Sequence, residues 1–401
     1  MWIKRDFLEH FDSKSCLEAI YLKGPRQIGK TSLLMRLEPR VQSEWFFDDL
    51  MTRERAQKDP EFLLSQSKFP VLIDEAHLAP EVFYTIKKRI DEVRRERLKE
   101  GSDSLKSALF RLTGSNLHEV NTSVQETLAG RVNIFFLHGL SWNEVINHAP
   151  KTFISEYLFR GGFPELWVRP ELSPVKFVND YISTFIEKDL ARSIGVEKKL
   201  EFLTVLKLLA ARVGSVLNYE SIGSDANVKG KTVKQWLSLL EENKILYVLE
   251  PYSSNLNQRL IKMPKVYFID TGICARLQAH PVSETLLNSP QAGALFECMV
   301  VSEVVKTRDH FRKEWSLHFW RTKEKEEIDL IIETDSDMIL VEVKLGSSSA
   351  HAINSPKTLS KVGKRITSII VTASGNRHRI SPSTECVPLN ELVPFLLSAL
   401  R

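Results

Sequence analysis

The stretch LEAIYLKGPRQIGKTSLLMRL, residues 17–37, decides the fold of the first part of the chain. It reads as an apolar strand, a glycine-bearing loop and an amphipathic helix in direct succession. The loop matches the pattern G-x-x-x-x-G-K-[ST], in which backbone N–H groups surround the phosphates of a nucleotide. Because both flanks have the required character, we interpret the stretch as a P-loop rather than as a chance glycine turn.

The P-loop gives individual residues an expected role in binding ATP. Gly24 and Gly29 allow the backbone to curl around the phosphates. Lys30 would neutralise the β- and γ-phosphates, and Thr31 would bind Mg²⁺. The expected nucleotide-binding residues are Gly24, Gln27, Ile28, Gly29, Lys30, Thr31 and Ser32.

A second motif, KFPVLIDEAHLAP at residues 68–80, is a continuous apolar run that ends in two acids. This pattern is typical of a buried parallel strand that carries carboxylates at its C-terminal end, as in a Walker B strand. Asp74 would hold the magnesium shell, and Glu75 would orient or deprotonate the attacking water. The alternative, in which these acids only cap a helix, is less favoured beside a P-loop.

Two further segments complete the expected ATPase. The apolar strand in ALFRLTGSNLHEV, residues 108–120, would present Ser115 or Asn116 to the γ-phosphate. Arg131 lies between a helix-like and a strand-like segment, so it could reach a nucleotide in a neighbouring subunit as an arginine finger. An ion-paired surface arginine is an equally good interpretation. The charged run at residues 86–106 favours a solvated helix face over a DNA contact.

The middle of the chain is typical of a winged helix-turn-helix. Residues 202–214 and 229–244 are amphipathic helices that flank a short turn-rich segment, and a β-rich segment follows. The third helix would direct Lys229, Lys231 and Lys234 at the major groove of DNA. A winged helix that only packs against its neighbours remains an equal alternative.

Near the C-terminus, IDLIIETDSDMILVEVK at residues 328–344 predicts a β-hairpin with charged groups at one end. The hairpin would bring Asp329 close to Glu342, with Lys344 on the same strand face as Glu342. Such acids can hold Mg²⁺ for phosphodiester cleavage while the lysine stabilises negative charge, and Glu297 on a preceding helix would add a ligand. Two alternatives remain: charges on a solvated edge strand, or a fold that binds DNA without cutting.

Composition narrows the class of protein. A chain of 401 residues with 43% hydrophobic and 26% charged residues suggests an ordinary globular protein of two to four domains. A net charge of +4 is too small to argue for nucleic-acid binding. The four cysteines lack paired spacing, which argues against disulfides and zinc and predicts a cytoplasmic location. No signal peptide or run of 18 apolar residues is found, so we expect neither export nor membrane insertion.

Taken together, the motifs resemble a widespread group of bacterial and archaeal AAA+-type ATPases whose C-terminal domain, of unknown function, is related to PD-(D/E)XK nucleases. The motifs that carry the resemblance are GPRQIGKTSL, VLIDEAH, LTGSN, LAGR, YLFRGGFPE, FIEKDL, KVYFIDTG, GALFE and the pair IDLII and VEVK. By matching these motifs, Glu75, Asn116 and Arg131 take ATPase roles. Lys188 in FIEKDL departs from the arginine usual there, which argues against an arginine-specific role at that position.

The resemblance implies an α/β chain in four parts. These are a P-loop AAA+ parallel-sheet domain at residues 1–150, a helical lid at 151–200, a winged helix at 201–255 and a restriction-endonuclease-like domain at 256–401. We expect an ATP- and Mg²⁺-dependent homo-oligomer that binds and remodels or processes DNA, with or without nuclease activity. The alternative function is an ATP-dependent signalling or defence switch with an inactive nuclease-like domain.

Overall fold

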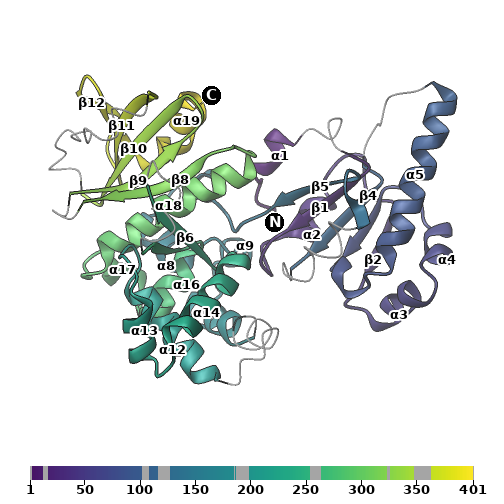
Figure 1. The fold of residues 1–401 in the computed structure, drawn as a ribbon, viewed down its shortest axis with the longest axis horizontal. Coiled ribbons are helices and arrows are strands. Elements are labelled where there is room, and N and C mark those ends of the chain that lie inside the picture. Colours follow the sequence, from purple (N-terminus) through teal and green to yellow (C-terminus); the bar gives the residue numbers. More distant parts are fainter. Residues whose placement is uncertain are drawn as a thin grey trace. The chain divides into compact units, whose positions relative to one another are not determined.

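In the computed structural model, the chain divides into two compact units (Figure 1). The N-terminal unit comprises residues 4–138 and 309–311, and the C-terminal unit comprises residues 1–3, 139–308 and 312–401. The structure describes residues 2–11, 17–101, 108–115, 127–184, 186, 198–252, 263–322, 326–346 and 363–400.

The N-terminal unit is built on a parallel sheet with the strand order β2-β3-β4-β1-β5. Strands β1 and β4 are buried along their whole length, as expected for continuous apolar runs at the centre of a parallel sheet. The carboxyl ends of parallel strands meet at one edge, so the segments that follow β1, β3 and β4 lie together. The strands are β1 (Ala19–Lys23), β2 (Ser43–Phe46), β3 (Val71–Asp74), β4 (Phe110–Gly114) and β5 (Val132–Phe136).

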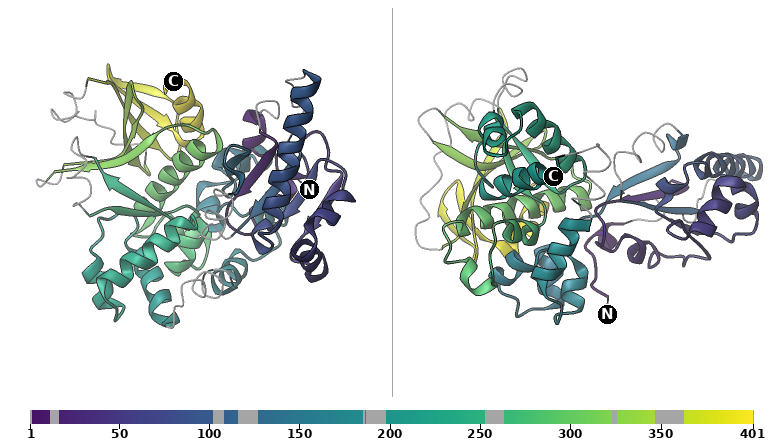
Figure 2. Two further views of the ribbon diagram at one scale, coloured as in Figure 1. Left: turned by 45° about the vertical axis from the view of Figure 1, so that its right-hand side comes forward. Right: turned by 90° about the horizontal axis from the view of Figure 1, so that it is seen from below.

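Helix α5 (Val82–Glu100) is the longest helix of this unit and packs its first half against the sheet (Figure 2). Its buried side chains, among them Phe83, Ile86 and Ile90, join a core with Tyr21 of β1. The rest of α5 is mostly charged and partly or fully exposed, in agreement with a solvated face. The other helical segments are α1 (Phe7–His10), α2 (Lys30–Leu34), α3 (Leu50–Lys58), α4 (Pro60–Ser65) and the 3₁₀ turn η2 (Ala76–Leu78).

The C-terminal unit contains a mixed sheet with the order β12-β13-β11-β10-β9-β8-β6-β7. The predicted hairpin is confirmed, because β9 and β10 pair antiparallel with Leu330 opposite Val341. Strands β10, β11 and β13 run parallel. The strands are β6 (Leu246–Pro251), β7 (Lys265–Phe268), β8 (Ser316–Arg321), β9 (Glu327–Glu333), β10 (Asp337–Lys344), β11 (Arg365–Thr372), β12 (His378–Ser381) and β13 (Thr384–Pro388).

The helices of this unit and its sheet share one continuous hydrophobic core that extends from Leu140 to Leu400. Helix α18 (Ala292–His310) contributes a run of buried residues to that core and carries Glu297, as predicted. The remaining helices are α7 (Trp142–His148), α8 (Ile154–Arg160), α9 (Pro164–Val168), α10 (Pro174–Tyr181), α12 (Lys199–Ala211), α13 (Tyr219–Asp225), α14 (Gly230–Glu242), α16 (Thr271–Leu277), α17 (Ser283–Leu286) and α19 (Leu389–Ala399).

The three helices expected for the winged helix are present as α12, α13 and α14, and the apolar residues Trp236, Leu237, Leu239 and Leu240 of α14 are buried. Strand β6, however, pairs with β7 on one side and with β8 on the other. In sequence, the expected boundary at residue 255 lies between two strands of this sheet. The winged-helix assignment is not confirmed, and the expected lid, winged helix and C-terminal domain lie in a single compact unit.

Two further expectations concern cysteines and membranes. Cys274, Cys298 and Cys386 are buried free thiols, and Cys16 lies outside the described residues. Within the described part of the chain, no helix combines the length and the apolar character needed to cross a bilayer.

Candidate functional site

The loop between β1 and α2 has the backbone shape that the P-loop pattern predicts. Gly24, Gln27 and Gly29 have φ values of 155°, 62° and 87°. A Cβ atom added to Gly24 would clash with the carbonyl oxygen of Leu137 and with Ile28. Glycine at position 24 is therefore needed both for the left-handed backbone and for close packing. Gln27 and Ser32 are exposed, whereas Ile28 is buried.

Lys30, the first residue of α2, is buried inside this loop. Its Nζ donates hydrogen bonds to the carbonyl oxygens of Gly24 at 3.0 Å and Pro25 at 2.8 Å. Burial lowers the pKa of Lys30 to about 8, although the carboxylates of Glu75 and Asp74 oppose this shift. The ammonium group thus lies where phosphate oxygens could replace the two carbonyl oxygens.

Thr31 and Asp74 are in direct contact, as expected for two residues that share a magnesium shell. Thr31 Oγ1 donates to Asp74 Oδ1 at 2.5 Å. Thr113 Oγ1 donates to the same oxygen at 2.7 Å. Hydroxyl and carboxylate oxygens are the hard ligands that Mg²⁺ prefers, so this donor set fits the ion.

Thr113 was not predicted from the sequence, although a signal for it was present. It stands two residues before Ser115, and side chains two apart in a strand point to the same face. A polar side chain on the Ser115 face of an otherwise apolar strand could therefore have been assigned to the site.

Glu75 has a left-handed backbone, with φ 50° and ψ 48°, and its N–H donates to Thr113 Oγ1 at 2.9 Å. Its Oε2 accepts from both the N–H and the hydroxyl of Ser115, each at 2.9 Å, and lies 3.3 Å from His77 Nδ1. Asp74 and Glu75 are therefore held by different partners, as two different roles require. Of the two predicted γ-phosphate contacts, Ser115 lies against Glu75, and Asn116 falls outside the described residues.

Arg5 supports the loop from a distant part of the sequence and was also missed. This buried guanidinium donates to the carbonyl oxygens of Ile28 at 2.9 Å and His138 at 2.7 Å. It therefore ties the backbone of the P-loop to the segment that follows β5. Only the folded chain brings these residues together, because Arg5 and His138 are separated by 133 positions.

Arg131 forms an ion pair and a hydrogen bond within the N-terminal unit. Its Nε and Nη2 bind the two carboxylate oxygens of Asp91 at 2.7 and 3.0 Å, and Nη1 donates to the carbonyl oxygen of Ala129 at 3.0 Å. This contact lowers the pKa of Asp91. The arrangement corresponds to the ion-paired alternative, and an arginine finger would require the bidentate pair to open.

The residues expected to contact DNA lie at the start of α14. Lys229 precedes the helix, and Lys231 and Lys234 lie in its first turns. All three side chains are exposed, whereas Val233 and Trp236 of the same helix are buried. The amphipathic pattern therefore places the lysines on the solvent face, as a DNA contact would need.

A second site, in the C-terminal unit, gathers the predicted acidic residues from α18, β9 and β10. Asp329 Oδ2 accepts the N–H of Val343 at 2.8 Å, and Lys344 Nζ lies 2.7 Å from Glu342 Oε1. Burial, together with the negative charges of Glu297 and Glu342, raises the pKa of Asp329 to about 7. The predicted residues are thus close enough for their charges to interact.

Three residues of this acidic cluster were missed: Lys265, Tyr267 and Glu327. Lys265 Nζ lies 2.5 Å from Glu327 Oε1 and 3.2 Å from Glu297 Oε1. Tyr267 donates its hydroxyl to the same Glu297 oxygen at 2.5 Å. Burial opposes the charge on Lys265, but Glu297 and Glu327 outweigh it and raise its pKa.

These contacts do not fit the predicted magnesium site of Glu297, Asp329 and Glu342. Among the residues that the structure describes, no group of three or more His, Cys, Asp or Glu side chains is arranged to hold a metal ion. The physical reason is that an ammonium and a phenol hydroxyl contact one oxygen of Glu297, the carboxylate expected to complete the site.

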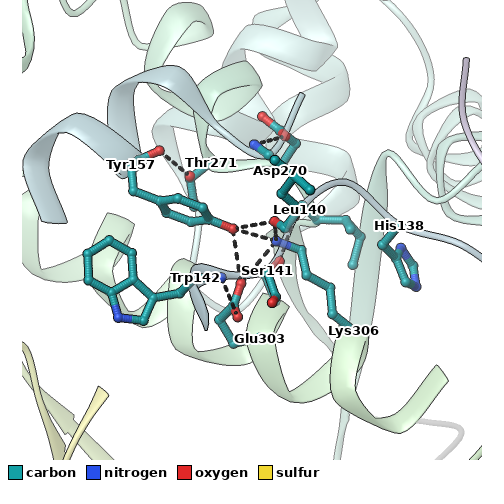
Figure 3. Close-up of polar contacts among 12 residues, drawn as sticks. His138, Leu140, Ser141, Trp142, Tyr157, Asp270, Thr271, Glu303 and Lys306 are labelled. Atoms are coloured by element: carbon teal, nitrogen blue, oxygen red, sulfur yellow. Dashed lines mark hydrogen bonds and ion pairs between the residues drawn. The ribbon is translucent and has the colours of Figure 1, made fainter. Parts of the chain in front are cut away.

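The motifs YLFRGGFPE and KVYFIDTG belong to a third, buried cluster (Figure 3). Lys306 Nζ donates to Tyr157 Oη at 2.7 Å, Glu303 Oε1 at 3.0 Å and the carbonyl oxygen of Leu140 at 3.1 Å. Glu303 Oε2 accepts the N–H of Trp142 at 2.9 Å. All polar partners lie inside the protein, so this cluster stabilises the C-terminal unit rather than presenting a surface for a ligand.

The glycine residues of these two motifs lie where the two segments approach each other closely. Asp270 Oδ2 accepts the N–H of Gly162 at 2.7 Å. A side chain at Gly161 would clash with the Asp270 carboxylate, and one at Gly272 would clash with the backbone of Arg160. The two segments can therefore approach only because glycine stands at these positions.

Comparisons with known proteins were made for the whole chain. Residues 17–146 match the model of an AAA domain. Residues 151–284 and 292–392 match two models described as domains of unknown function, DUF8612 and DUF4143. The AAA match supports an AAA-type ATPase domain in the N-terminal part of the chain.

The relatives have uncharacterized functions. The chain is 26% identical over 380 residues to uncharacterized proteins of Mycobacterium bovis and Mycobacterium tuberculosis, covering 93% of this chain and 80% of each relative. It is 23% identical over 275 residues to an uncharacterized protein of Haemophilus influenzae, covering 63% of this chain and 67% of the relative.

Similarity to solved structures is low. The ORC2 protein of Aeropyrum pernix, in its ADPNP-ADP complexes, matches with a TM-score of 0.30 and 11% identity, covering 74% of this chain and 92% of that one. Protein VC1899 of Vibrio cholerae matches with a TM-score of 0.20 and 13% identity, covering 95% of this chain and 97% of that one. Scores this low do not indicate a shared fold.

Proposed function

We propose that the protein is an ATP-hydrolysing AAA+ protein that binds DNA and remodels or processes it. The observation that carries the proposal is the meeting of Lys30, Thr31, Asp74 and Glu75 at one edge of the parallel sheet. There Thr31 and Thr113 donate to Asp74, and Thr113 also accepts the N–H of Glu75. The match of this region to an AAA domain supports it.

Each of these residues would have a distinct part in the reaction. The loop N–H groups and Lys30 bind the phosphates, and Thr31 and Asp74 hold Mg²⁺. The ion, when bound, offsets negative charge on the β- and γ-phosphates. Glu75 accepts the proton of the attacking water through Oε1, because Ser115 and His77 already contact Oε2.

The first test replaces the proposed base, Glu75, with glutamine. Glu75→Gln keeps the size of the side chain and its ability to accept from Ser115, but the amide cannot take a proton. We expect ATP turnover to fall by about 100-fold or more, since a positioned general base contributes ~10²–10⁴-fold, while ATP binding persists. Steady-state phosphate release and equilibrium binding of a fluorescent ATP analogue measure the two properties. Unreduced turnover would show that another group activates the water.

The proposed partner is DNA, because Lys229, Lys231 and Lys234 form an exposed basic group at the start of α14. A homo-oligomer is also part of the proposal, and sedimentation with and without ATP tests it. The cytoplasmic location remains a prediction.

A second candidate function is an ATP-dependent signalling or defence switch with an inactive C-terminal site. The contact of Lys265 with Glu297 favours it, because it engages one of the acids expected to hold the Mg²⁺ of a nuclease. DNA-stimulated ATP turnover would favour DNA processing. Slow turnover that is indifferent to DNA would favour the switch.

A further inference from the structure

Lys265 is fixed within the acidic cluster by its backbone as well as by its side chain. It begins β7, where it pairs antiparallel with Leu249 of β6 and forms a bridge to Val216. Its side chain is only 2% exposed, and Nζ lies 5.5 Å from the ring centre of Phe319. Both the backbone and the side chain of Lys265 are therefore packed within the C-terminal unit.

The ammonium group of Lys265 lies where a cation would offset the negative charge of the acidic cluster. Its Nζ contacts Glu297 from α18 and Glu327 from β9, two carboxylates from separate elements. Glu297 and Glu327 are partly buried, with side chains 17% and 28% exposed, and pairing with Lys265 offsets part of the cost of removing their charges from water. Tyr267, two residues further along β7, adds a hydrogen bond to Glu297.

Each carboxylate expected to bind Mg²⁺ is engaged by a donor of the protein. Glu297 Oε1 contacts Lys265 and Tyr267, Asp329 Oδ2 accepts the N–H of Val343, and Glu342 Oε1 pairs with Lys344. A magnesium ion needs close oxygen ligands in nearly octahedral geometry. It would also be repelled by the nearby ammonium group in a setting of low dielectric constant.

We propose that Lys265 replaces a divalent metal as the charge-balancing cation of the acidic cluster, so that the C-terminal unit keeps a nuclease-like acidic site without binding Mg²⁺ or cleaving DNA. The cluster then acts as a structural centre that joins β7, α18 and the β9–β10 hairpin. This inference does not depend on ATP hydrolysis, which concerns residues of the N-terminal unit.

The direct test measures Mn²⁺ binding to the full chain without nucleotide, by electron paramagnetic resonance of the free ion. Wild type is compared with Asp329→Asn, which removes one expected ligand. We expect equal Mn²⁺ binding by the two proteins, because the cluster holds no metal in either. A bound Mn²⁺ that wild type holds and Asp329→Asn loses would overturn the proposal. Mn²⁺ bound at the nucleotide site is the same in both proteins, so it does not affect the difference in Mn²⁺ binding between them.

A second variant tests the role of the lysine itself. Lys265→Met keeps a similar shape but removes the charge, so Glu297 loses its ammonium partner, whereas Glu327 keeps Arg321, whose Nε lies 3.6 Å from its Oε2. We expect its melting temperature to fall and Mn²⁺ to raise it again, with no comparable rise for wild type or for the charge-preserving control Lys265→Arg. An unchanged melting temperature, or no response to Mn²⁺, would show that Lys265 does not take the place of a metal. If Lys265→Met does not fold, the comparison of wild type with Asp329→Asn still decides the question.

DNA cleavage provides an independent readout. Labelled linear, forked and four-way DNA is incubated with the full chain and Mn²⁺, with Asp329→Asn and Glu342→Gln as comparisons. We expect no strand scission above the level of these variants. Scission by wild type that both variants abolish would overturn the proposal and leave the ATPase assignment unaffected, because nucleotide binding is measured separately.

Discussion

Lys30 combines burial with two carbonyl contacts, and this combination makes its charge sensitive to pH. Burial lowers its pKa to about 8, so in the nucleotide-free protein the ammonium loses its proton well below the usual range for lysine. Bound phosphates favour the charged form, so the pKa must rise when ATP binds. Binding and protonation are therefore linked at this residue.

The resulting prediction concerns the pH dependence of ATP affinity. Above about pH 8 free Lys30 is increasingly neutral, so binding must take up a proton and the affinity should fall as pH rises from 8 to 9. Calorimetric titrations in buffers of different ionisation enthalpy measure the proton uptake directly. Lys30→Arg is the matched control, because a guanidinium stays charged and should show no uptake. A constant affinity over this range would mean that Lys30 does not titrate there.

Thr113 leads to a second prediction at the residue scale. Its hydroxyl donates to Asp74 and accepts the N–H of Glu75, so Thr113→Val removes both hydrogen bonds while preserving the shape. An unsatisfied buried polar group costs about 1–3 kcal/mol, and we expect the free energy of unfolding to fall by that amount. Turnover should fall as well, because the Asp74 carboxylate and the Glu75 backbone lose their shared partner.

Urea unfolding and ATP hydrolysis measure the two effects of Thr113→Val. Thr113→Ser keeps the hydroxyl and should retain most of both properties. A loss in Thr113→Ser with none in Thr113→Val would point to the methyl group, and thus to packing rather than hydrogen bonding.

The residues that sequence could identify are those whose partners lie within a local pattern. Lys30 and Thr31 stand in one loop motif, and Asp74 and Glu75 follow one apolar run. Thr113 and Lys265 were missed because their partners come from other elements, 39 positions away for Asp74 and 32 for Glu297. Two residues that far apart in the sequence can lie at any distance in space until the pairing of the strands is known.

At the scale of elements, β4 supports α2 through a charged residue inside an apolar strand. Arg111 is 1% exposed, and its Nη1 donates to the carbonyl oxygens of Leu34 at 2.8 Å and Leu37 at 2.9 Å. Its Nη2 donates to the carbonyl oxygen of Pro39. The arginine thus satisfies carbonyl groups at and beyond the C-terminal end of the helix that carries Lys30 and Thr31.

Replacing this arginine tests the connection between the two elements. We expect Arg111→Met to lower the free energy of unfolding by about 1–3 kcal/mol or more, because it leaves buried carbonyl groups without donors. ATP affinity should fall too, since the end of α2 loses its anchor. Urea unfolding and fluorescent nucleotide titration measure these effects. The exposed Arg55→Met is the control and should change neither quantity, and an equally stable Arg111→Met would show that water replaces the lost donors.

The elements of the C-terminal unit show which part of a fold a sequence determines locally. The amphipathic periodicity of the sequence predicted α12 and α14, and the alternation of side chains along the strands predicted the β9–β10 hairpin. The pairing of β6 with β8 was not predicted, because it joins Glu250 to His318 across 68 positions. Helices depend on neighbours three and four residues away, whereas sheet partners depend on the whole fold.

At the scale of the whole molecule, the two candidate sites lie in different compact units. The nucleotide site belongs to the N-terminal unit, and the exposed lysines of α14 and the acidic cluster belong to the C-terminal unit. The four-part division expected from the resemblance stays a prediction, and its last three parts contribute residues to one large hydrophobic core. Hydrophobic burial depends on contacts between distant segments, which motif boundaries do not reveal.

DNA binding is the property of the whole chain that the basic start of α14 should control. Lys231→Glu combined with Lys234→Glu reverses two exposed charges without touching the buried face of the helix. Each lost phosphate contact should lower the slope of log affinity against log salt by about 0.9, so we expect weaker binding and a slope smaller by up to about 1.8. Fluorescence anisotropy of labelled duplex DNA over a range of salt concentrations measures both.

The control must carry the same change in net charge at another exposed surface of the same unit. Lys176→Glu combined with Lys207→Glu meets this condition, because both lysines are exposed and lie on α10 and α12. A specific DNA surface predicts a smaller slope for the α14 variant and an unchanged slope for the control, since contacts with phosphates are local whereas net charge acts at long range. Equal weakening in both variants would mean that only overall charge attracts DNA. An unchanged slope in the α14 variant would remove this helix from the DNA-binding surface.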